Sequence, residues 1–261
     1  MMDEILITGV GPVSAIGIGR TAFRDGLRRG ESAVAPLSLF AADIPTAEVR
    51  GFNLDDILAS RKTYLDRSGE FALAAAQLAL NDAGLSPDNY DKWRTGVVMG
   101  STYGSLPTLQ TFTAGVQQKG VRSANSILFS HSYLNTPASL IAIEFGLGGH
   151  HGAFAGADAG TQALESAREA LQLGRADVIM VVGVDVISEA LLRALAAEGT
   201  LNDVLGEGAC ALILETAAHA ATRGATGIPY PAEQPPTDTV RPLLGVTFAA
   251  EPLFAIAATL G

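Results

Sequence analysis

One stretch of the sequence, from Ala153 to Val184, constrains the fold more than any other part of the chain. The mostly small residues from Ala153 to Ala159 predict a short buried strand that ends in a tight turn. Apolar side chains then recur at intervals of three and four, the period of an amphipathic helix, at Ala163, Leu164, Ala167, Ala170 and Leu171. The apolar run from Ala176 to Val184 predicts a second strand, buried on both faces. Strand, helix and strand in this order form a βαβ unit, which predicts an α/β fold.

The turn between the first strand and the helix is a place where an α/β protein can hold a reactive group. A helix N-terminus offers free N–H groups and the positive end of the helix dipole there. The turn contains neither cysteine nor serine, and it reads Gly156-Ala157-Asp158-Ala159-Gly160. We interpret Asp158 as an N-terminal helix carboxylate, with a catalytic carboxylate as the alternative. The one cysteine of the chain, Cys210, lies in an apolar run, which favours a small buried side chain over a displaced nucleophile.

Charge and composition exclude several classes of function. The formal net charge of −10 argues against a nucleic-acid surface, which needs a basic stripe. The chain has no signal-peptide pattern at its start and no apolar run long enough to span a membrane, so we expect a cytoplasmic protein. His150 and His151 are adjacent but have no further ligand at a suitable spacing, and Gly9-Val10-Gly11 lacks a third glycine. We therefore expect neither a metal nor a dinucleotide cofactor.

The remaining sequence predicts further strands and helices, and a proline-rich stretch near its end. Apolar strands are predicted at Glu4–Val10, Arg94–Gly100 and Leu205–Glu215. Helices are predicted at Thr21–Gly30, Asp66–Gly84, Pro107–Val116, from about Thr136, and at Ser188–Glu198. The proline-rich stretch Ala225–Thr239 reads as a linker, and Val240–Leu260 as a strand, turn and helix. The predicted division is therefore 1–224 as one unit and 225–261 as a linker with a strand-helix remnant.

Several of these segments resemble the β-ketoacyl-acyl-carrier-protein synthases, condensing enzymes of the thiolase fold. The resemblance covers Ile5 to Glu215 and is carried by four segments. They are the opening Ile7-Thr8-Gly9 with Gly11, Ser14 and Gly17; Asn135-Thr136-Pro137-Ala138; the run from Gly152 to Ser188; and Gly206-Glu207-Gly208-Ala209. Such enzymes are internal duplications of two βαβαβ halves. The resemblance implies a nearly complete first half and a severely truncated second half.

The resemblance also places this chain's residues on the catalytic positions of the family. Ala157 stands at the position of the nucleophilic cysteine, and a shift of one residue would place Asp158 there. Val246 stands at the position of one catalytic histidine, with Arg241 near that of a lysine. The stretch that would carry the other histidine is absent between Thr216 and Val240. The resemblance therefore implies a chain that is catalytically silent on its own.

The resemblance implies a function as a subunit. Some condensing enzymes pair with a nucleophile-lacking sister, the chain length factor, and this chain looks like a shortened form, similar to the partner subunits of aryl polyene systems. We expect it to form a heterodimer with an active ketosynthase in fatty acid or polyketide chain elongation, and to meet the acyl carrier protein only through that partner. The expected interface is Asn135, Ala153, Phe154, Ala155, Gly156 and Ala157, with neighbours in Ser130–Leu140, and the expected acyl-pocket residues are Thr108 and Phe112.

Two alternatives stay open at this point. The first is a stand-alone hydrolase or decarboxylase of acyl thioesters that uses Asp158 or Cys210. The second is a homodimeric protein that binds acyl chains. The sequence gives neither the identity of a partner nor the length of an acyl chain.

Overall fold

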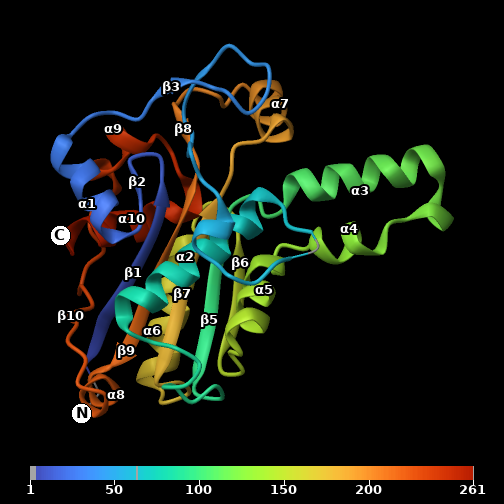
Figure 1. The fold of residues 1–261 in the computed structure, drawn as a ribbon. Helices are drawn as coiled ribbons and strands as arrows, with labels where there is room; N and C mark the ends of the chain where they lie inside the picture. The colour runs from blue at the N-terminus through green and yellow to red at the C-terminus, as the bar shows by residue number, and fades with distance from the viewer. Residues whose placement is uncertain (1–3, 63, 261) are drawn as a thin grey trace.

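A mixed seven-stranded sheet forms the centre of the computed structural model, which describes residues 4–62 and 64–260 (Figure 1). The order of its strands is β10-β1-β9-β7-β5-β6, with β2 also paired to β1. Their bounds are β1 Ile5–Ser14, β2 Gly17–Ile18, β5 Thr95–Ser101, β6 His151–Ala155, β7 Val178–Asp185, β9 Gly208–Thr216 and β10 Ile228–Pro229. A smaller sheet joins β3 (Ala35–Pro36), β4 (Pro45–Ala47) and β8 (Leu205–Gly206).

The direction of the strands decides where a site can lie. β5 runs parallel to both β6 and β7, while β9 is antiparallel to its neighbours β7 and β1. The carboxyl ends of β5, β6 and β7 therefore meet at one end of the sheet. In α/β proteins that end is where loops usually build the functional site.

Helices cover both faces of the sheet. On one face, α2 (Arg67–Ala83) and α5 (Thr136–Phe145) pack on inward side chains such as Val97 and Met99. On the other, α1 (Arg20–Arg29), α6 (Ala159–Gln172) and α10 (Glu251–Thr259) pack on side chains such as Val98 and Leu212. The sheet is thus the middle of three layers, as expected for an α/β fold.

Two helices leave this body. α3 (Leu106–Lys119) and α4 (Ser126–His131), with the 3₁₀ turn η2 (Val121–Ser123) between them, project sideways from the sheet as an arm (Figure 1). The remaining elements are short: η1 (Leu54–Asp56), α7 (Glu189–Glu198), α8 (Ala217–Thr222), η3 (Thr237–Thr239), α9 (Arg241–Leu244) and η4 (Phe248–Ala250). Within the described part of the chain, no helix is both long and apolar enough to cross a membrane.

Most of the long elements agree with the sequence prediction. α6 buries all five of its predicted apolar positions, and every residue of β7 is buried. Asp66 caps α2 through its side chain and Gly84 ends it in a left-handed conformation, as the turn chemistry predicts. The chain extends β1 to Ser14, beyond the predicted end at Val10, and forms α4, which the sequence prediction missed.

Two predictions were wrong in their structural detail. The strand that begins the βαβ unit is not the buried strand that was predicted, because β6 is the edge strand and exposes alternate residues, among them Ala153 and Ala155. The stretch after Val240 begins with the short helix α9 rather than a strand. Pro242 explains the second difference, since proline donates no N–H to a ladder but fits the first turn of a helix.

The proline-rich stretch runs along the body instead of leading away from it. β10 pairs antiparallel with β1, with Ile228 opposite Ile7 and Pro229 opposite Leu6. The apolar side chains of α10, including Leu253 and Phe254, then join the same core as those of β1 and β9. Residues 225–260 therefore extend the central sheet at its β1 edge and cover part of one face.

Candidate functional site

The candidate site is the turn between β6 and α6, at the carboxyl ends of the parallel strands. Gly156 has a φ of 102°, a conformation that side chains other than glycine's rarely tolerate. Its carbonyl accepts a hydrogen bond from the Ala159 N–H at 3.1 Å, which closes the turn. Ala157 and Asp158, which follow it, are both exposed. The side chain at the apex of this turn is therefore a methyl group open to solvent.

Asp158 occupies the N-cap position of α6, as predicted, but its side chain does not cap the helix. The backbone carbonyl of Asp158 accepts from Gln162 N–H at 2.9 Å, while the carboxylate makes no capping hydrogen bond. General acid–base catalysis needs a side chain within hydrogen-bond reach of its reaction partner. In the described part of the chain, the Asp158 carboxylate forms no such pair with a base or a nucleophile.

Asp185, the last residue of β7, organises the neighbouring loops. It is 1% exposed and accepts hydrogen bonds from the Ser101 hydroxyl and from the backbone N–H groups of Thr102, Tyr103 and Ala249, each at about 3.0 Å. Burial raises the pKa of Asp185, and the four donors act in the opposite direction. One buried carboxyl group thereby ties the loop after β5 to the segment 248–250.

The segment around η4 packs directly on the start of α6. A Cβ atom on Gly160 would lie 2.1 Å from the Ala249 carbonyl oxygen, and one on Gly183 would lie 2.4 Å from it, so both positions need glycine. Phe248 has a φ of 51° and its ring packs edge-on against Tyr103, with 5.0 Å between ring centroids. The loops around the turn are therefore held in one packed arrangement.

Val246 lies just before this segment and contributes no polar group to it. It is half-buried, and its N–H donates to the Val204 carbonyl at 2.9 Å beside a single parallel bridge to Leu205. Arg241, predicted near a lysine position of the resembled family, is paired with Glu251. The four histidines lie elsewhere: His131 at the end of α4, His150 and His151 at the start of β6, and His219 on α8.

Cys210 is confirmed as a buried side chain. It sits on β9 between Pro12 of β1 and Gly183 of β7, and it is 0% exposed. Burial raises the pKa of its thiol. A reactive cysteine needs exposure and a lowered pKa, and this thiol has neither.

The residues predicted for an interface lie along one side of the molecule. Ala153, Phe154, Ala155, Gly156 and Ala157 are the end of β6 and the turn that follows it. Asn135 is exposed at the start of α5, the helix that packs beside β6. Their role in pairing with another chain stays a prediction.

The two residues predicted for an acyl pocket differ in their surroundings. Thr108 is 1% exposed, and its hydroxyl donates to Asp66 Oδ2 at 2.8 Å. Phe112 is half-buried in the arm against Phe129, with 5.4 Å between ring centroids. Thr108 thus faces the body and Phe112 faces the other helix of the arm, and their contact with an acyl chain stays a prediction.

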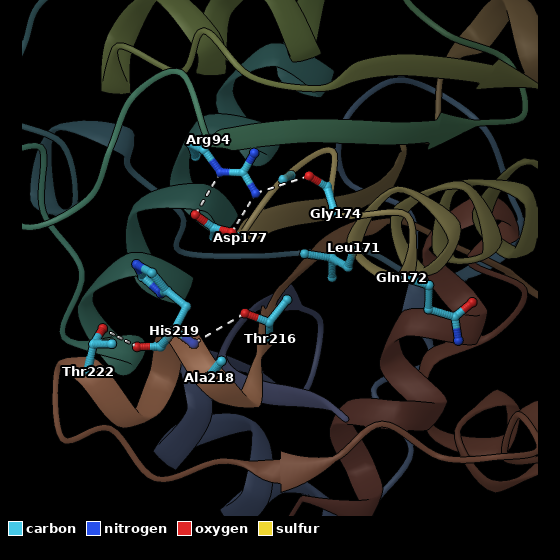
Figure 2. Close-up of a pocket in the computed structure, with 10 residues that line it drawn as sticks. Arg94, Leu171, Gln172, Gly174, Asp177, Thr216, Ala218, His219 and Thr222 are labelled. Atoms are coloured by element: carbon cyan, nitrogen blue, oxygen red, sulfur yellow. Dashed lines mark hydrogen bonds and ion pairs between the residues drawn. The ribbon is translucent and has the colours of Figure 1, made fainter. Parts of the chain in front are cut away.

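A cavity that the sequence does not reveal lies at the opposite end of the sheet (Figure 2). It measures about 620 Å³ and is lined by Arg94 and Asp177, which precede β5 and β7, and by Thr216, His219 and Thr222. Arg94 donates to both carboxylate oxygens of Asp177, at 2.8 and 2.7 Å, and holds the pKa of that carboxyl below its usual value. The charges in this cavity neutralise each other, and no group of three metal-binding side chains occurs within the described ranges.

Comparisons with known proteins bear on the whole chain. Residues 2–220 match the family described as "Beta-ketoacyl synthase, N-terminal domain". A "Putative polyketide beta-ketoacyl synthase 1" of Streptomyces halstedii is 31% identical over 260 residues, covering 86% of this chain and 61% of that protein. The chain thus spans about three fifths of that relative's length.

Two solved structures share the fold. "The ishigamide ketosynthase/chain length factor" superimposes with a TM-score of 0.78 at 23% identity, over 87% of this chain and 62% of that one. A beta-ketoacyl synthase from Burkholderia phymatum STM815 gives a TM-score of 0.74 at 24% identity, over 99% of this chain and 71% of that one. The second superposition includes nearly all of the chain, so it reaches into the C-terminal segment that packs on the sheet.

Proposed function

The chain belongs to the beta-ketoacyl synthase family, a family of thiolase-like condensing enzymes, and from this membership we propose that it is a catalytically silent, chain-length-factor-like subunit of an active ketosynthase. The pair would act in polyketide or fatty acid chain elongation, with aryl polyene synthesis as the narrower assignment. The acyl carrier protein would be met through the partner. The similar proteins, a putative polyketide beta-ketoacyl synthase and a ketosynthase/chain length factor, support this assignment.

Catalytic silence is supported by the side chains at the β6–α6 turn. Acyl transfer through a covalent intermediate needs an activated nucleophile and donors that stabilise the developing charge. Ala157 is exposed at the apex of the turn, and its methyl group supplies neither function. Cys210 is enclosed in the sheet and Val246 is apolar, so neither substitutes for it.

A partner is supported by the edge of the sheet at β6. β6 hydrogen-bonds to β5 on one side, and its other side has no strand partner in the part of the chain described. An unpaired edge of this kind is a template for another strand. Of the eleven exposed large apolar side chains described, six lie on the arm, on α5 or between them: Leu109, Val121, Ile127, Phe129, Tyr133 and Ile143.

The outer face of α6 contrasts with this edge. Glu165 and Arg168 form an exposed ion pair there, and Glu169 and Gln172 are exposed beside them. A charged helix face of this kind is suited to solvent. The exposed apolar surface therefore lies on the side of the molecule that carries β6. This surface and the methyl group of Ala157 at the turn are the two observations that support the proposal.

Co-expression with an active ketosynthase tests the proposal directly. We expect a complex with one copy of each chain, measured by size-exclusion chromatography with light scattering. We also expect no turnover of acyl thioesters by this chain alone. Ala153→Arg places a charge on the exposed edge of β6 and should abolish the complex, since a buried unpaired charge at an interface is costly.

Ala232→Arg is the matched control, because Ala232 is exposed in the proline-rich stretch away from β6. It should leave the complex intact. A chain that binds no ketosynthase, or that loses binding equally in both variants, would contradict the proposed pairing. Turnover by the chain alone that disappears in Asp158→Ala would favour the hydrolase instead.

A further inference from the structure

The arm formed by α3, η2 and α4 (residues 106–131) is fastened to the body mainly at its base (Figure 1). Thr108 is the one buried residue described in α3, and none of the residues described in α4 is buried. Phe112, Phe129 and Tyr133 pack in series, with centroids 5.4 and 5.1 Å apart. These contacts hold the two helices of the arm together, but they do not fix the arm against the sheet.

The first fastening is Thr108, through the N-cap of α2. Its hydroxyl donates to Asp66 Oδ2 at 2.8 Å. Asp66 is itself fixed, because its other oxygen accepts from the Gly69 N–H at 2.9 Å and from the Ser68 hydroxyl at 2.8 Å. The start of α3 is thereby anchored to a helix that lies in the core.

The second fastening is Tyr64, which touches both helices of the arm. Its hydroxyl lies 3.2 Å from Thr108 Oγ1 on α3. Thr108 has one hydroxyl hydrogen and gives it to Asp66, so Tyr64 must be the donor in this contact. The Tyr64 ring also packs edge-on against His131 at the end of α4, with 5.2 Å between ring centroids.

Tyr64 is well placed to act as a fixed point. Ser60 and Lys62, which precede it, are held to α5 by Glu144, which accepts a hydrogen bond from each of them. The Tyr64 side chain itself is half-buried. One side chain on a tethered loop thus joins the start of α3 to the end of α4, while α3 also contacts α7.

We propose that Tyr64 is a positioning residue: by donating to Thr108 and packing on His131, it fixes the direction in which the arm leaves the body. The inference deepens the proposed function, because the arm carries exposed apolar side chains that the partner subunit would cover. Tyr64 acts through the two helices that it joins. It therefore sets the shape of the surface presented to the partner.

Hydrogen–deuterium exchange on the full chain tests the positioning without any partner. Tyr64→Phe keeps the ring and removes the donor to Thr108, and we expect peptides from α3 to exchange about fivefold faster. Because Phe112 of α3 packs on Phe129 of α4, peptides from α4 should exchange faster with them. Peptides from α2, which shares the Asp66 cap, serve as the internal reference and should keep their rate. Unchanged exchange in the arm, or an increase confined to α3, would overturn the proposal.

Thr108 supplies the matched pair of variants. Thr108→Val removes the hydroxyl at nearly constant shape and should loosen the arm at least as much as Tyr64→Phe, whereas Thr108→Ser should retain the parent rate. The double variant Tyr64→Phe with Thr108→Val should exchange no faster than Thr108→Val alone, because the two changes break one shared network. Additive effects, or failure of serine to preserve the rate, would contradict the network.

Affinity for a purified active ketosynthase separates this proposal from the one on which it rests. Tyr64→Phe should weaken binding severalfold with no matching change in the unfolding midpoint. Thr108→Val should weaken binding at least as much, and Thr108→Ser should bind like the parent. If the parent chain binds no ketosynthase, the proposed function fails while the exchange result still decides the role of Tyr64. Normal affinity in a variant whose arm is loosened would refute the link between arm direction and partner binding.

Discussion

Replacing Glu207 with glutamine should be among the most destabilising single-atom changes in this chain. The Glu207 side chain is 0% exposed and sits between the two sheets at the start of β9. Its oxygens accept from Arg67 Nε at 3.1 and 3.0 Å and from Arg67 Nη2 at 2.5 Å. They also accept from the backbone N–H groups of Val49 at 3.0 Å and Ile187 at 3.2 Å.

The magnitude follows from what glutamine leaves behind. Its amide oxygen can still accept one or two of these bonds, but its NH₂ group faces donors and the Arg67 charge loses its counter-ion. Breaking a buried ion pair by removing one partner costs about 3–5 kcal/mol. Because the Arg67 side chain is 25% exposed and also lies over the Phe71 ring, we expect the lower end, about 3 kcal/mol.

Urea unfolding followed by far-UV circular dichroism measures this loss. A change of about 3 kcal/mol should lower the unfolding midpoint by about 1 M. Glu165→Gln is the control, since it removes the same charge from an exposed pair with Arg168 and should change stability by at most about 0.5 kcal/mol. A loss below about 1 kcal/mol for Glu207→Gln would refute the account of Glu207 as the buried link between the sheets.

Three further predictions rest on features described above. Cys210 should not react with a thiol reagent in the native protein, because burial raises its thiol pKa, and should react once per chain in denaturant; fast native labelling would contradict its burial. The bond from Arg94 lowers the pKa of Asp177, so its stabilisation is present above the unfolded value of about 4 and is lost as the pH falls through the lower folded pKa. Asp177→Asn should flatten that part of a plot of unfolding midpoint against pH, and an unchanged slope would count against it. Gly160→Ala should cost about 1–3 kcal/mol, because its Cβ would meet the Ala249 carbonyl, whereas Gly115→Ala, with open space around it, should be neutral or stabilising in the same melt.

Local patterns predicted the elements whose burial depends on their own period. Ala163, Leu164 and Ala167 lie on one face of α6 because a helix repeats every 3.6 residues, wherever the neighbouring strands lie. β6 is different, because its small residues are compatible with a strand in the middle or at the edge of a sheet. Its position at the edge is decided by pairing with β5, which no local pattern encodes.

The candidate site was predictable in part. The methyl group of Ala157 at the turn can be read from the sequence once the βαβ unit is identified, and the burial of Cys210 from its apolar neighbours. The role of Asp185 was missed, although one acidic residue at the end of a buried run is a signal of a carboxyl group held by loops. Its donors come from 64 to 84 residues away along the chain, and only the folded chain brings them together.

The two margins of the central sheet are finished differently, and this limits how the molecule can assemble. On the β1 side, β10 covers Leu6 and Ile7, the Asp82 carboxylate binds the Val10 N–H at 2.9 Å, and β2 covers Val13 and Ser14. The backbone of β1 is thus already paired at these positions, and Pro229 of β10 has no N–H to donate to another strand. Among the described strands of the central sheet, β6 is the edge left open to another strand, so pairing of this sheet through β6 joins two chains and does not continue into a fibre.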